Sequence, residues 1–98
     1  MGNGSSLTLG KEARMPPIIH KGRHYRVVRG SDVERDGMFL ELWSAERPDH
    51  QLFEAFYSDA TGEMHFASFL DEDVPFEVIE EFTKQARHLL TPTTDEKA

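Results

Sequence analysis

Alternating apolar and polar positions predict a run of short strands through the middle of the chain. The alternation is clearest over 38–43, where Met38, Leu40 and Leu42 fall on one side of the expected strand. The other side of this strand carries two large rings and one acid. Similar stretches, rich in β-branched and aromatic residues and bounded by Gly, Pro, Asp or Ser, span 25–29, 52–58 and 63–70.

The last two of these stretches predict a β-hairpin closed at residues 59–62. Its Asp-Ala-Thr-Gly sequence is typical of a three-residue loop in which Gly62 takes a positive φ. Such a loop places Phe56 opposite Phe66 and Tyr57 opposite His65. In this register both faces of the hairpin are apolar.

A helix is predicted over Pro75–Leu90 by a 3.6-residue apolar period. Its apolar side chains fall within an arc of about 160°, and every charged side chain lies outside that arc. Pro75 suits the first turn, and Pro92 ends the helix near Leu90. The pattern therefore predicts an α+β fold, an antiparallel β-meander of about four strands with one C-terminal helix packed on one face (β-β-β-β-α).

Length and composition fit one small folded domain. The chain has 98 residues, of which 38% are hydrophobic and 30% charged. We expect a flexible N-terminal arm over 1–17, because this segment lacks a period and ends in Pro16-Pro17. A single α+β domain is then expected over 18–91 and a disordered tail over 92–98.

The charge distribution argues against a nucleic-acid partner. The net charge is −7, yet residues 1–37 carry seven Lys or Arg against four acids, so the remainder sums to −10. This acidic bulk repels phosphate backbones. The chain has no cysteine and no apolar run long enough to span a membrane, so we expect a cytoplasmic protein with no membrane partner.

A short basic segment follows the predicted arm. Lys21, Arg23, Arg26 and Arg29 could form a basic patch that tracks phosphates. The same residues also suit an edge strand whose charges prevent edge-to-edge pairing, and we favour this second interpretation.

The predicted sheet has more apolar residues than one helix can cover. The face left open would form a large apolar patch, which marks an interaction surface. We expect a homodimer through this face, with the arm, a ligand or another protein as the alternative cover. The candidate partner surface comprises Phe39, Trp43, Phe53, Tyr57 and Phe69. If the helix covers that face, the open set is instead Leu40, Leu42, Phe56 and Phe66.

Catalytic and cofactor motifs are absent from the sequence. It has no nucleophile elbow and no Gly-rich phosphate loop ahead of a helix, and Pro and Gly around His20 and His24 argue against a helical metal pair. We therefore expect a binding protein without catalytic activity, metal or cofactor. Two alternatives stay open: an acidic inhibitor or antitoxin-like module that binds a basic protein, and a ligand or enzymatic pocket formed by His65, Trp43 and Tyr57.

Overall fold

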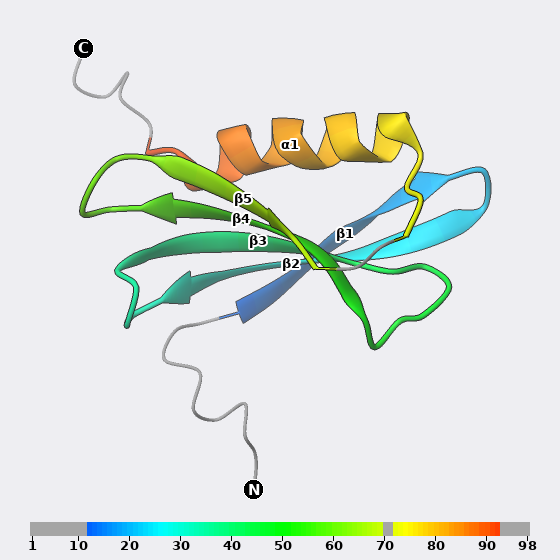
Figure 1. Cartoon of the computed structure of the whole chain (residues 1–98), viewed down its shortest axis with the longest axis horizontal. Coiled ribbons are helices and arrows are strands. Elements are labelled where there is room, and N and C mark those ends of the chain that lie inside the picture. Colours follow the sequence, from blue (N-terminus) through cyan, green and yellow to red (C-terminus); the bar gives the residue numbers. More distant parts are fainter. Residues whose placement is uncertain (1–11, 70–71, 93–98) are drawn as a thin grey trace, which may run out of the picture.

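The computed structural model, described here for residues 12–69 and 72–92, is a twisted antiparallel sheet with one helix lying across a single face (Figure 1). The sheet has five strands in the order β1-β2-β3-β4-β5, so each strand pairs with its neighbour in sequence. The α+β class and the meander are confirmed. The elements are β1 (Glu12–His20), β2 (Arg23–Asp32), β3 (Gly37–Trp43), β4 (Gln51–Ser58), β5 (Met64–Ser68) and α1 (Phe76–Leu90).

Strand β1 occupies part of the segment that the sequence predicted as an arm. It pairs with β2 from Glu12 opposite Gly30 to His20 opposite Arg23. The predicted boundary at residue 17 is therefore wrong. Pro16 and Pro17 interrupt the ladder without ending the strand, because β1 is an edge strand and the register shifts around the two prolines. The rest of the predicted arm and residues 93–98 of the predicted tail lie outside the described residues.

The hairpin between β4 and β5 differs by one residue from the predicted register. Gly62 has the expected positive φ of 75°, but the Ser58 N–H donates to the Glu63 carbonyl at 2.9 Å, which leaves four residues in the loop. Phe56 therefore lies opposite His65, and Phe66 lies opposite Ala55. A shift of one residue moves every side chain of β5 to the other face.

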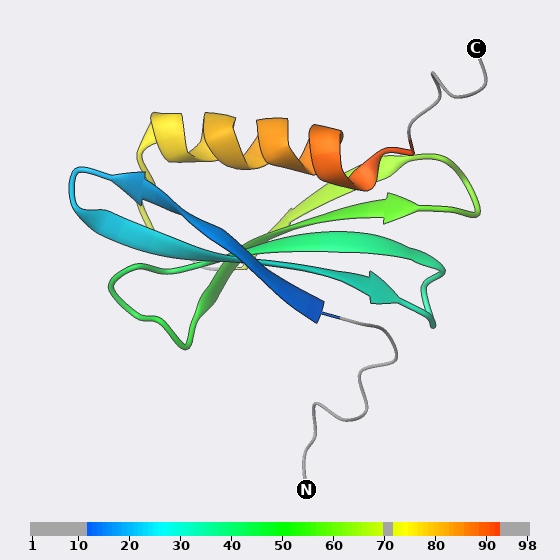
Figure 2. The ribbon, with the colours of Figure 1, turned by 180° about the vertical axis from the view of Figure 1, so that it is seen from behind.

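The core lies between α1 and the face of the sheet that carries Leu40 and Leu42 (Figures 1 and 2). We call this the helix face and the opposite one the open face. The predicted helix is confirmed, and its centre contributes Phe82, which is fully buried. Phe76 was predicted on the buried arc, yet it is 67% exposed, because it lies at the border of that arc in the first turn. The other buried helix residues are Val78, Ala86 and Leu90.

The position of the core predicts that two phenylalanines of α1 contribute very differently to the free energy of unfolding. Phe82→Ala should lower the free energy of unfolding by about 3–5 kcal/mol, because it leaves a cavity between helix and sheet. Phe76→Ala should cost less than about 0.5 kcal/mol, because its ring is already largely in water. Urea unfolding followed by circular dichroism compares the two variants. Equal losses would contradict the placement of the core.

Candidate functional site

The open face of the sheet buries a small aromatic cluster, and no second layer of secondary structure covers it within residues 12–69 and 72–92. Val28, Phe39 and Phe56 are 7%, 5% and 9% exposed, and Trp43 packs against them. The helix lies on the other face (Figure 2). Among the described residues, these side chains are therefore covered by neighbours in the sheet and its turns.

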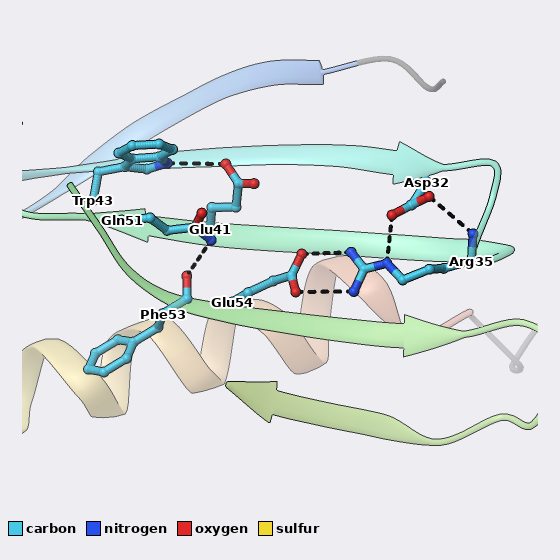
Figure 3. A network of polar contacts seen from close by, with 7 residues as sticks. All are labelled: Asp32, Arg35, Glu41, Trp43, Gln51, Phe53 and Glu54. Carbon is cyan, nitrogen blue, oxygen red and sulfur yellow. Dashed lines mark hydrogen bonds and ion pairs between the residues drawn. The ribbon is translucent and has the colours of Figure 1, made fainter. Parts of the chain in front are cut away.

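Arg35, in the turn between β2 and β3, lies over Phe56. Its guanidinium carbon is 4.1 Å from the centre of the Phe56 ring. The same guanidinium donates to both carboxylate oxygens of Glu54, at 2.7 and 3.2 Å, and its Nε donates to Asp32 at 2.6 Å (Figure 3). The Arg35 hydrogen bonds hold the pKa of Asp32 below its ordinary value. They also define the orientation of the guanidinium over the ring.

Gly37 allows the Phe56 ring to lie close to the sheet. A Cβ atom at this position would collide with the Phe56 ring and with the Tyr57 carbonyl oxygen. Glycine is therefore required here for close packing, since any side chain would displace the ring from beneath Arg35.

A second arginine covers Trp43 at the other end of the open face. The Arg26 guanidinium carbon is 4.4 Å from the Trp43 ring centre, and its Nη2 donates to the Pro48 carbonyl at 3.1 Å. The Trp43 Nε1 donates in turn to the Glu41 carboxylate at 3.1 Å (Figure 3). Phe56 and Trp43 are thus each shielded from water by the planar guanidinium group of an arginine.

Glu41 lies between these two arginine–aromatic pairs. Burial raises the pKa of its carboxyl, and the nearby charges of Glu12 and Glu54 act in the same direction, whereas the Trp43 hydrogen bond opposes them. Glu54, its cross-strand neighbour, is bound by Arg35. Glu41 forms no ion pair among the described residues, so no ion-paired cation offsets the effect of burial on its charged form.

The sheet divides the partner surface that the sequence predicted. Phe39 and Trp43 lie on the open face, whereas Phe53 and Tyr57 belong to the core under the helix. Phe69 follows β5 and is 53% exposed. The structure does not bring these five side chains together on one surface.

The predicted pocket around His65 is divided in the same way. His65 pairs with Phe56, and its side chain is 64% exposed beside Glu63, with a distance of 3.2 Å between the His65 Nε2 and the Glu63 carboxylate. Tyr57 points to the helix face, so it cannot share a pocket with Trp43 and His65. The shifted hairpin register is the cause of this separation.

The four residues of the predicted basic patch also lie apart. Lys21 lies in the turn before β2, and Arg23 pairs with Glu46 at 3.4 Å. Arg26 covers Trp43 on the open face, whereas the Arg29 Nη2 donates to the Leu89 carbonyl at 2.9 Å, at the C-terminal end of α1. Two of these arginines therefore support the fold from opposite faces of β2.

The sequence analysis did not predict that β5 has an outer edge that pairs with no other strand of the described residues. Ladder bonds join Ser58 to Glu63 and Phe69 to Leu52. Since such bonds alternate along an antiparallel pair, the N–H and C=O groups of Met64, Phe66 and Ser68 point away from β4. The sequence feature that could have indicated this edge is a strand of five residues without Asp, Glu, Lys or Arg. Because the predicted register was off by one residue, it did not give the correct outward-facing residues.

An apolar groove runs between this edge and the helix. It encloses about 230 Å³. Phe66 forms one wall; it is 51% exposed, with its ring centre 5.1 Å from that of Phe53 and 6.4 Å from that of Phe82. The groove exists because α1 passes over β1, β3 and β4 and stops short of β5. Its lining residues are Ala55, Met64, His65, Phe66, Thr83, Ala86 and Arg87.

Residues 12–69 and 72–92 contain neither a metal-binding cluster nor a membrane-spanning helix. No group of three or more His, Cys, Asp or Glu residues in these ranges is arranged to hold a metal ion. No helix there is long and apolar enough to cross a membrane. Comparisons with protein-family models, with curated proteins and with solved structures gave no match.

The Arg35 contacts predict a measurable loss when that side chain is removed. Arg35→Ala should lower the free energy of unfolding by roughly 1–2 kcal/mol, because it breaks a bidentate ion pair and exposes Phe56. Arg23→Ala is the matched control and should change little, since its pair with Glu46 is exposed on both sides. Thermal or urea unfolding measures both. Equal effects would show that the aromatic cover contributes nothing.

Part of the Arg35 effect should disappear in acid. Asp32 has a pKa lowered by Arg35 in the folded protein. Its contribution to stability is therefore complete above the unfolded-state pKa and lost as the pH falls through the folded-state value. The difference in the free energy of unfolding between wild type and Arg35→Ala should therefore become smaller as the pH falls through the folded-state pKa of Asp32.

The contribution of Glu41 to the free energy of unfolding should depend on pH with the opposite sign. Because its pKa is raised in the folded state, its contribution is favourable below the unfolded-state pKa and is lost as the pH rises through the folded-state value. Glu41→Gln retains an acceptor for Trp43 and removes the charge. This variant should be more stable than wild type at neutral pH, with the gain vanishing in acid.

Urea unfolding between about pH 3 and pH 8 tests the Glu41 prediction. Glu34→Gln, in the exposed turn between β2 and β3, removes the same charge and should give no comparable gain. A loss of stability at neutral pH in Glu41→Gln would contradict the prediction.

Proposed function

We propose that the protein is a non-catalytic interaction module that binds an extended protein segment by strand addition at β5. One observation carries the proposal: the outward peptide groups of Met64, Phe66 and Ser68 border the apolar groove beside α1. In strand addition, peptide hydrogen bonds supply affinity and side-chain pockets supply specificity. This edge offers both.

The open face supports the proposal by contrast. Its aromatic rings are covered by Arg26 and Arg35, each held by further hydrogen bonds. The large apolar patch that would have favoured face-to-face association is therefore not exposed over the described residues. A partner that stacked on this face would have to displace paired charges, which is costly.

The other sheet edge is less suited to strand addition. β1 contains Pro16 and Pro17, which lack N–H donors, and its register shifts between Met15 and Ile18. β5 has no proline and no Asp, Glu, Lys or Arg. An incoming strand thus finds a continuous set of donors and acceptors at β5.

The groove also indicates the composition of the segment that binds. Phe66 and Met64 provide apolar contact, whereas Arg87 lies at the rim. We infer that the preferred segment is extended and apolar, and that an acidic group of the partner lies beside Arg87. This chemistry differs from the alternative of an acidic inhibitor, whose partner would be basic. A cytoplasmic location remains part of the proposal and fits a chain without cysteine.

Peptides selected from a random display library test the proposal. Selection against the wild-type protein should give extended apolar sequences that slow hydrogen exchange at the outward amides of Met64, Phe66 and Ser68. Phe66→Lys should weaken binding of the selected peptides by about tenfold or more, because it places a charge in the groove.

Ala67→Lys is the matched control, since it adds the same charge to the same strand on the open face and Ala67 does not line the groove. Binding should be retained in this variant. Selected peptides that protect amides of the open face, or that bind Phe66→Lys as well as wild type, would overturn the proposal.

A further inference from the structure

We propose that the segment that β5 binds is the β5 of a second copy, so that two chains form one continuous antiparallel sheet about a two-fold axis. This inference rests on the proposed function and names its partner. It does not follow from strand addition alone, because the same edge could serve an unrelated peptide. Three properties of the edge favour a second copy.

The outward groups of β5 are self-complementary. They belong to Met64, Phe66 and Ser68, which are spaced evenly about the centre of the strand. When two copies run antiparallel about Phe66, Phe66 meets the partner's Phe66 and Met64 meets the partner's Ser68. Every outward group then has a partner, which gives roughly six hydrogen bonds. A C2 interface requires this kind of self-matching.

The side chains on the helix face match under the same operation. Phe66 projects from the helix face, where it contacts Phe53 and Phe82. Pairing through Phe66 places the two half-exposed rings side by side at the axis, an arrangement that stabilises antiparallel strands. The two grooves become one continuous depression between the two helices, and the water-exposed area of Phe66 falls.

The charges along the two helices also favour this orientation. Thr83 and Arg87 line the groove, and Glu80 lies in the same helical row as Thr83 and Arg87. The two-fold axis makes the helices antiparallel, so the Arg87 end of one helix faces the Glu80 end of the other. For a chain with net charge −7, this edge is a place where a second copy meets opposite charge.

The difference between the two edges predicts a closed dimer rather than a fibre. Continued growth of the sheet would require β1 to pair with another copy, but Pro16 and Pro17 interrupt its ladder. Pairing of β5 with β5 uses one edge from each copy. The assembly therefore ends at two chains.

Sedimentation equilibrium with the full chain, from about 1 to 200 µM, tests the dimer. The expected result is a mass rising to twice 11.2 kDa, with hydrogen exchange at the Met64, Phe66 and Ser68 amides slowing as concentration rises. Phe66→Lys should raise the dissociation constant about tenfold or more, and Ala67→Lys, on the open face and outside the groove, should leave the dimer intact.

Ser68→Pro gives a second test that spares the ladder to β4. The Ser68 N–H points outward, so its loss removes donors to the partner without breaking a bond within the chain. Circular dichroism checks that each variant is folded, and a folded Ser68→Pro should dissociate like Phe66→Lys.

Two outcomes would overturn the inference. The first is a wild-type monomer across the whole concentration range, and the second is a dimer in which the three outward amides exchange as fast as in the monomer. A monomer that still protects these amides on binding a selected peptide rejects the second copy but retains the proposed function. If the chain stays a monomer and no selected peptide protects the outward amides, strand addition itself is rejected.

Discussion

The structure depends on one constraint: a single helix can cover one face of a five-stranded sheet and no more. Within the described residues, the opposite face is then kept from water by side chains of the strands and of the turns that join them. Arg35 over Phe56 and Arg26 over Trp43 meet this need with flat cations whose edges remain hydrogen-bonded. A small α+β protein can thus bury rings on both faces without a second layer, because guanidinium groups combine a planar surface with retained solvation.

This arrangement gives the uneven charge distribution a structural explanation. The basic residues of the first part of the chain do not gather on one surface. Arg26 and Arg35 cover rings on the open face, and Arg29 reaches the last turn of α1 from the helix face. Arg26 and Arg29 bind the carbonyl groups of Pro48 and Leu89, and Arg35 binds Glu54 as well as Asp32. These arginines therefore join the first part of the chain to later segments, in one case through an ion pair.

The sequence predicted the elements whose signals are local. The period of α1, the two faces of β3 and the positive φ of Gly62 all follow from neighbouring residues. What it did not predict depends on contacts at a distance or on small differences in turn energy. The two prolines Pro16-Pro17 indicated the end of a flexible arm, but this segment forms β1 because it pairs with β2. A loop of four rather than three residues changed the face of every β5 side chain, so the predicted partner surface and the predicted pocket contain residues that the sheet separates.

The same constraint explains why β5 remains open. A helix of 15 residues, placed to bury Phe82 over the centre of the sheet, cannot also reach the last strand. Covering β5 would require moving α1 away from β1, which would expose Ile18 and the core around it. β1 is protected by its prolines and by the helix. Leaving β5 uncovered therefore lowers the stability of the fold less than moving α1 away from β1 would. That edge has a half-exposed ring at its centre and no charged side chain, features that edge strands avoid unless they pair.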